Sequence, residues 1–297
     1  MTLPLHIDPS WHPLVTGCPP AWASKWGEDR HGVFVAFTLG DVTQRLRWIP
    51  PGRFEMGSPA DEPGRDDDEG PRHSVYIRQG FWLFDTPCTQ ALWEAVMGEN
   101  PSMFRSPDRP VEQVSWDDVQ VFLDRINARL PGLDLALPTE AQWEYACRAG
   151  TETALYTGAI EIRGDANAPA LDPIAWYGGN SSVGFELDNG LDRGWLSDMQ
   201  YPEGRAGTHP VRRKRLNPWG LYDMLGNVWE WCADGPRTYD ADWQLDPLGP
   251  LEDGADPVFR GGSWDDPARV CRSAYRGRYD PGLRYDYLGF RCARVQS

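Results

Sequence analysis

Cysteine and histidine are scarce in this chain, and neither occurs at a metal-binding spacing. The 297 residues include six cysteines and five histidines, with no CxxC pair and no HxxH or HxxxH pattern. These absences exclude the common local zinc motifs. In a reducing compartment, cysteines spread over a whole chain are usually buried and unpaired. The spacing therefore favours free thiols at Cys18, Cys88, Cys147, Cys232, Cys271 and Cys292.

Long hydrophobic runs and positive charge are also lacking. Met1–Val15 has no basic start followed by an apolar segment, so it does not resemble a secretory signal, and no run reaches membrane-spanning length. The formal net charge is -15, and a field of this sign repels phosphate backbones and anionic lipid surfaces. We expect a cytoplasmic protein that has no nucleic-acid or membrane partner and is a monomer.

Aromatic residues, glycine and proline are abundant, with 15 Trp, 31 Gly and 27 Pro. Such a composition is typical of a folded chain with many turns. Alternating apolar residues predict a hairpin of two strands, and capping residues before 3.6-residue periodicity predict three helices. After these elements the chain shows only short apolar pieces. The expected elements are strands at Gly32–Leu39 and Val42–Trp48 and helices at Thr89–Met97, Ser115–Leu130 and Thr139–Arg148.

The order of elements, helices first and short strands later, predicts an irregular α+β fold. We expect residues 1–47 to form an N-terminal extension with the hairpin, and residues 48–297 to form one main domain. Between the first strands of that domain, Ser58–Pro71 is strongly acidic. Its four successive acids, Asp66 to Glu69, lack the spacing of an EF-hand, so a solvated loop is expected.

The C-terminal segment 260–297 interleaves two kinds of residue, and no helical or strand period explains their order. Arginine and tryptophan recur as a framework: Arg260, Trp264, Arg272, Arg276 and Arg291. Tyrosine, aspartate and small residues lie between them, which suits a binding surface because tyrosine offers rigid contact area and aspartate and glycine suit adaptable loops. An ordinary surface loop is the alternative. These variable positions are Asp265, Asp266, Val270, Gly277, Tyr279, Leu283, Tyr285, Asp286 and Tyr287.

Several longer motifs occur in a fixed order between residues 48 and 293. They include FEMG at Phe54–Gly57, LPTEAQWEYACR at Leu137–Arg148, NPWGLYDMLGNVWEW at Asn217–Trp231, RGGSW at Arg260–Trp264 and GFR at Gly289–Arg291. Together they resemble the formylglycine-generating-enzyme, or sulfatase-modifying-factor, family. The resemblance implies a C-type-lectin-like α+β fold that is loop-rich, has few helices and short strands, and is pinned by buried Trp and Arg.

The resemblance also implies a copper chemistry that this chain does not complete. The enzyme of that family binds copper through two cysteines just after its RGGS motif. Cys271 matches the second cysteine, but Asp266 stands at the place of the first. Cu(I) prefers a pair of soft thiolates, which a carboxylate does not replace. We therefore expect no copper and no enzymatic activity. The alternative is a copper-dependent oxidase or another member of the family whose sequence is not diversified.

A calcium site of the family matches residues within DMLGNVWE. The resemblance implies that Asp223 and Glu230 ligate the ion with their side chains, and Gly226 and Val228 with their carbonyl groups. Oxygen-only ligation suits a hard cation such as Ca²⁺, whose role here would be structural. The equal alternative is that both acids hydrogen-bond the loop backbone.

Within the family, the segment 260–291 is most similar to the variable region of diversity-generating retroelement proteins. There RGGSW, CRSAYR and GFR enclose Asn-rich positions, and CRSAYR is present here at Cys271–Arg276. An error-prone reverse transcriptase alters template adenines, so AAY codons are its targets. Every residue at the nine variable positions is reachable from AAY through its first two bases.

This resemblance implies a binding function without catalysis. Framework arginines would fix the loops by hydrogen bonding to carbonyl groups and acids, and the variable side chains would form the binding surface. The three tyrosines would act as anchors and the aspartates as polar selectors. We expect a protein or peptide ligand, with a small ligand as the alternative. A regulatory adaptor that docks through residues 1–45 is a weaker third hypothesis.

Overall fold

The computed structural model describes residues 19–192, 194–201, 204–250 and 255–295. The expectations for Met1–Val15 and Cys18 lie outside these ranges. Within them, the other five cysteines are buried and unpaired, as expected. No helix among the described residues combines the length and the apolar character needed to cross a bilayer.

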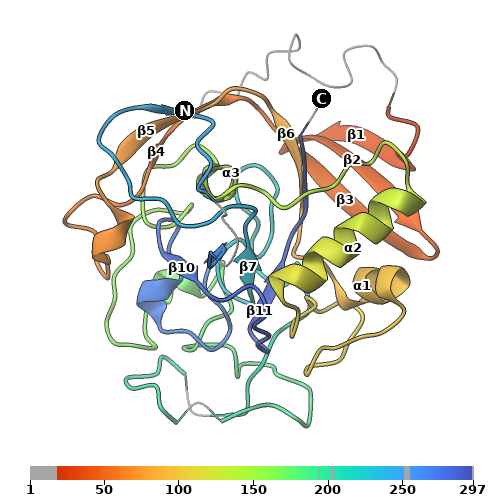
Figure 1. Cartoon of the computed structure of the whole chain (residues 1–297). Helices are drawn as coiled ribbons and strands as arrows, with labels where there is room; N and C mark the ends of the chain where they lie inside the picture. The colour runs from red at the N-terminus through yellow and green to blue at the C-terminus, as the bar shows by residue number, and fades with distance from the viewer. Residues whose placement is uncertain (1–18, 193, 202–203, 251–254, 296–297) are drawn as a thin grey trace.

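The largest sheet contains both ends of the described chain. Its order is β1-β2-β3-β6-β12, and all neighbours are antiparallel. The expected hairpin is confirmed as β2 and β3, which meet at the Leu39–Val42 pair. The expected boundary between residues 47 and 48 falls inside β3, which also pairs with β6 (Figure 1). The strands are β1 (Lys25–Asp29), β2 (Gly32–Leu39), β3 (Val42–Ile49), β6 (Phe81–Phe84) and β12 (Ala293–Val295).

All three expected helices are present: α1 (Gln90–Met97), α2 (Trp116–Arg129) and α3 (Glu140–Arg148). Their starts agree with the sequence signals, because Ser115 and Thr139 form the expected capping boxes and Thr89 caps α1. At the end of α3 the left-handed cap is Ala149 (φ 46°), and Gly150 follows it, also at positive φ. Figure 1 shows α1 and α2 beside β3, and α3 near the centre of the molecule.

Two smaller sheets complete the fold, and one of them is built largely from the C-terminal segment. The order of this four-stranded sheet is β10-β9-β7-β11, with β7 and β11 parallel. The other sheet has the order β4-β5-β8. The strands are β4 (Gly52–Met56), β5 (His73–Ile77), β7 (Trp229–Trp231), β8 (Gln244–Leu245), β9 (Val258–Arg260), β10 (Arg276–Arg278) and β11 (Leu288–Phe290).

Candidate functional site: an aromatic cavity beneath the C-terminal segment

Arg272 joins the C-terminal segment to the acidic loop. The expectation of a solvated loop was wrong for two of its acids, because Glu69 is fully buried and Glu62 nearly so. The Arg272 guanidinium lies 2.6 Å from Glu62 and 2.5 Å from Glu69 and also donates to the carbonyl oxygen of Gly64. The acids that look like a surface run in the sequence therefore balance a buried framework arginine.

Arg260 and Arg276 attach the same segment to α3. Arg276 forms two hydrogen bonds with Glu140, at 2.7 and 2.6 Å. Arg260 pairs with Glu144 and donates to three consecutive carbonyl oxygens, those of residues 273–275. All of these side chains are buried. Charged hydrogen bonds to carboxylates and carbonyl oxygens thus fix backbone that has little regular secondary structure.

The backbone at the variable positions is held by groups elsewhere in the chain. The Gln113 amide donates to the carbonyl oxygen of Tyr285, and the Trp229 amide donates to that of Tyr287. Between them, the buried Trp264 indole donates to the carbonyl oxygen of Asp286 over 3.0 Å. These bonds use main-chain acceptors, which every amino acid supplies. The loop path therefore does not depend on which side chains occupy these three positions.

The variable side chains converge on one cavity. Its volume is about 440 Å³, and it lies between the four-stranded sheet, the 3-10 turn Ala268–Val270 and the loop that carries Trp195. Such a volume suits one amino-acid side chain or a small organic group. Six of the nine variable positions line this aromatic cavity: Asp265, Asp266, Val270, Gly277, Tyr279 and Tyr287.

An almost continuous row of rings crosses the site. Phe259 lies 4.6 Å from Tyr279, Tyr279 lies 5.3 Å from Tyr285, and Tyr285 stacks on Tyr287 at 4.8 Å, all between ring centroids. The three tyrosines are half-buried, so each keeps an accessible part while packing against the core. They form one cluster that is neither in the interior nor scattered over the surface.

The two neighbouring aspartates line the cavity, and both are half-buried. Burial raises the pKa of Asp266 to about 6, although hydrogen bonds from Ser263 and Trp229 favour its ionised form. The Ser263 hydroxyl lies 2.5 Å from the Asp266 carboxyl and 3.3 Å from the backbone nitrogen of Asp265. The cavity therefore places carboxyl groups among aromatic rings.

Three variable positions lie outside the cavity lining. Tyr285 reaches the site through its ring contacts with Tyr279 and Tyr287. Leu283 is 37% exposed in the loop after β10. Asp286 is half-buried near Glu112, and burial raises the pKa of its carboxyl. The nine positions thus divide into a cavity group and an outer group.

Sequence reasoning missed the aromatic walls that do not belong to the variable positions. Trp195 is 61% exposed and comes from a long loop, whereas Trp229 and Phe259 are buried and Tyr275 is half-buried. Trp229 lies in the NVWEW motif, which supplied a signal for burial but not for a cavity wall. A lone tryptophan in a polar loop was the available signal for Trp195.

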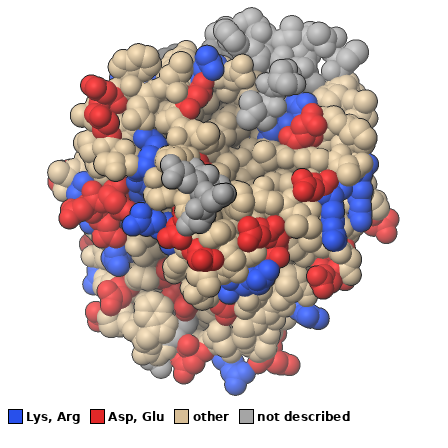
Figure 2. All heavy atoms as spheres, in the orientation of Figure 1, with Lys and Arg blue, Asp and Glu red and all other residues tan. Residues whose placement is uncertain are grey.

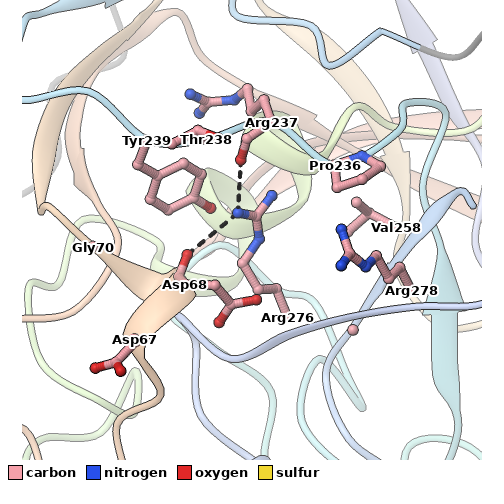
Figure 3. Close-up of a pocket in the computed structure, with 11 residues that line it drawn as sticks. Asp67, Asp68, Gly70, Pro236, Arg237, Thr238, Tyr239, Val258, Arg276 and Arg278 are labelled. Carbon is pink, nitrogen blue, oxygen red and sulfur yellow. Dashed lines mark hydrogen bonds between the residues drawn. The ribbon is translucent and has the colours of Figure 1, made fainter.

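A second, mixed-charge pocket of about 290 Å³ adjoins the first and shares Gly277 and Arg278 with it. Figure 3 shows Arg276 reaching between the carbonyl groups of Arg237 and Asp68, to which it donates over 2.9 and 3.3 Å. Figure 2 shows acidic side chains gathered around the 3-10 turn Asp67–Glu69, at the left of that view, with basic side chains beside them. Apart from the variable position Gly277, this pocket is built from framework and loop residues.

The residues at the copper positions do not fit Cu(I). Cys271 is fully buried, and burial raises the pKa of its thiol well above the usual range, which disfavours the thiolate that the metal needs. Asp266 stands at the place of the family's first copper cysteine, and its carboxyl is hydrogen-bonded to Ser263. A hard oxygen donor and a protonated thiol do not make the soft donor pair that Cu(I) prefers.

The residues at the calcium positions do not fit Ca²⁺ as they are arranged here. Glu230 receives Arg291 on both carboxylate oxygens, at 2.6 and 2.7 Å, and the Trp143 indole at 2.7 Å. Arg291 also donates to the carbonyl oxygen of Asp223, whose carboxyl accepts the Arg212 amide. The Arg291 guanidinium thus supplies the positive charge that a calcium ion would otherwise supply beside Asp223 and Glu230. Asp223 accepts a backbone amide, as the alternative expected, whereas the partners of Glu230 are side chains. Gly226 and Val228 are buried.

Comparisons with known proteins agree with this architecture. The model of the sulfatase-modifying factor enzyme 1-like domain matches residues 39–296. The formylglycine-generating enzyme of Thermomonospora curvata is 34% identical over 241 residues, which cover 75% of this chain and 67% of that protein. A Bos taurus protein named inactive C-alpha-formylglycine-generating enzyme 2 is 29% identical, over 72% of this chain and 58% of its own length.

Among solved structures, Treponema denticola variable protein 1 is similar along nearly its whole length. The two share 27% identity with a TM-score of 0.70, over 89% of this chain and 99% of the other. The chain spans about half the length of the mammalian formylglycine-generating enzymes that it matches, 50% in Bos taurus and 53% in Mus musculus. The expected loop-rich α+β fold of the formylglycine-generating-enzyme type is confirmed.

Proposed function

The chain belongs to the sulfatase-modifying-factor family, and within that family we propose that it is a ligand-binding variable protein of a diversity-generating retroelement. The ligand is a protein or peptide, which binds at the aromatic cavity and the tyrosine row. The proposal assigns the segment 260–291 to recognition without oxidation chemistry. Similarity to a variable protein from Treponema denticola supports it.

One observation carries the proposal. Six of the nine variable positions line a single cavity, and groups elsewhere in the chain hold the backbone of residues 285–287 through main-chain acceptors. Side chains can therefore be exchanged without losing the bonds that fix the loop. Diversification needs this separation between the atoms that hold the fold and the atoms that meet the ligand.

The binding part of the proposal is tested by selecting displayed random peptides on the immobilised protein. The selected peptides are then titrated by calorimetry against the wild-type chain, against Y279A/Y285A/Y287A and against W243A. Trp243 is 71% exposed and lies outside the cavity lining, so it is a matched aromatic control. We expect the triple variant to lose at least about tenfold in affinity, equivalent to about 1.4 kcal/mol, and W243A to be unchanged. Equal losses in both variants would refute the assignment.

The retroelement part has a separate test at the gene. We expect a reverse-transcriptase gene nearby, together with a near-copy of the last coding stretch that differs only at adenines. Differences spread over all bases, or over the codons of Arg260, Arg272 and Arg291, would contradict diversification. Binding at the cavity would then stand as a fixed property of this chain.

A further inference from the structure

The aromatic cavity combines ring faces with carboxyl groups. Trp195, Trp229, Tyr279 and Tyr287 contribute rings, and Asp265 and Asp266 contribute acids. The faces of aromatic rings carry negative partial charge and attract cations, most strongly in the case of tryptophan. We propose that this cavity binds a cationic side chain, lysine or arginine, presented by the ligand. The inference rests on the proposed function, since it names the chemistry of that same site.

The balance of charge in the lining favours a cation over an anion. Two basic side chains also line the cavity, but one of them is already paired: Arg269 lies 3.2 Å from Asp66 on the acidic loop. The other, Arg278, is exposed and lines the mixed-charge pocket as well, where Figure 3 shows it near Val258 and Pro236. The lining thus holds two carboxyl groups, and one of its two guanidinium groups also pairs with an acid outside the cavity.

The cost of covering the acids argues against a purely apolar ligand. Asp266 has already lost much of its hydration, as the raised pKa of its carboxyl shows. A neutral group placed over it would remove more water and return no charge, which is costly for a carboxylate. An ammonium or guanidinium group returns that charge, while its aliphatic stem packs on the rings as lysine and arginine stems do on apolar surfaces.

Trp195 has a defined part in this arrangement. It is a wall of the cavity but is not a variable position, and 61% of it is exposed. Exposed tryptophan at the rim of a hollow is characteristic of residues that become buried on binding. The loop therefore supplies an aromatic wall that does not belong to the variable positions. The net charge of -15 on the whole chain adds long-range attraction for a basic partner.

The test uses blocked amino acids on the full chain: Nα-acetyl-lysine methylamide, the arginine analogue, and the norleucine analogue as a neutral match for lysine. Binding is followed by NMR at the indole N–H signals of Trp195 and Trp229, assigned with W195F and W229F. We expect both cationic probes to bind at least about tenfold more tightly than norleucine, with the difference reduced as salt is added. The stronger of the two cationic probes identifies the side chain.

Three variants decide the sign of the effect. D266N should lower the affinity for the cationic probes about tenfold, and W195A should lower it about threefold. R278Q should raise that affinity. The affinity for the norleucine probe should change little in D266N and R278Q. Trp195 and Arg278 are exposed, so W195A and R278Q keep the test valid if D266N fails to fold. Weaker binding in R278Q, or norleucine binding as tight as lysine, would overturn the inference. Peptides that lack basic residues but still need Tyr279, Tyr285 and Tyr287 would leave the proposed function intact and remove only this inference.

Discussion

Replacing Arg272 with methionine should be among the most destabilising single changes in the C-terminal segment. The Arg272 side chain is fully buried between Glu62 and Glu69 and also donates to the carbonyl oxygens of Gly64 and Arg269. Methionine fills most of the volume but leaves two acids without their cation. Removing one partner of a buried pair typically costs about 3–5 kcal/mol, because a charge is left buried and unpaired.

That cost is a large part of the roughly 5–15 kcal/mol that stabilises a typical domain. A loss of 3–5 kcal/mol corresponds to a decrease in Tm of roughly 6 to 20 °C for a domain of about 250 residues. The assay is urea denaturation followed by far-UV circular dichroism, with a thermal scan as a second measurement. Both are compared with the wild-type chain at pH 7 and low salt.

Arg269 provides the matched control because it is an arginine three residues before Arg272 that also pairs with the acidic loop. Its pair with Asp66 is nearly half exposed on both sides, and exposed pairs contribute at most about 1 kcal/mol. R269M should therefore cost far less than R272M. A second control, R272M/E62Q/E69Q, removes the unpaired charges and should recover much of the loss. If R272M costs no more than R269M, the buried pair does not hold the segment, and the framework argument fails.

Two further predictions concern calcium and pH. Arg291 occupies both carboxylate oxygens of Glu230, so the Tm in 1 mM Ca²⁺ and the Tm in excess EDTA should agree within about 1 °C. An increase of several degrees with Ca²⁺ that is absent in E230Q would instead show that calcium binds at this site. Burial raises the pKa of Glu112 from 4.5 to about 8. Between these two values the native state keeps a proton that the unfolded state has lost. The free energy of unfolding of the wild type should therefore fall as pH rises from 4.5 to about 8. The side chain at position 112 cannot titrate in E112Q. The free energy of unfolding of E112Q relative to the wild type should therefore increase by up to about 1.4 kcal/mol per pH unit in that range. Parallel stability curves at pH 5, 7 and 9 would show that burial does not shift Glu112.

Local patterns were sufficient to predict the helices and the first hairpin. Ser115 and Thr139 identify the starts of α2 and α3, since a capping residue followed by an acid or amide satisfies free backbone amides. The strands of the C-terminal sheet are only three residues long, too short to show a period. Strand β1 reads KWGED and is largely exposed, so its sequence carries no hydrophobic alternation. These strands form because of long-range pairing, which a local pattern does not contain.

The candidate site was predictable in its members but not in its arrangement. The alternation of arginine with exchangeable residues identified the positions, including six that line the cavity. It did not identify the acidic loop as the partner of Arg272, because the contact joins residues more than 200 positions apart in the chain. The contact of Trp195 with the cavity is also long-range, so a local pattern does not contain it. Which residues meet across a fold with few regular elements depends on loop paths, and buried charges fix these paths only once the whole chain is folded.

The variable positions differ in what an exchange would do, and Gly277 is the clearest case. A Cβ atom at this position would lie 2.4 Å from the ring of Phe259. That ring packs on both Trp229 and Tyr279, at 4.8 and 4.6 Å between centroids. A larger residue at 277 must therefore displace Phe259 and, with it, the start of the tyrosine row. Leu283, by contrast, is 37% exposed, and its replacement changes only the outer surface. Exchange at 277 would reshape the cavity for its other residues, whereas exchange at 283 would alter the outer surface, so the proposed diversification would change either the shape of the site or its rim.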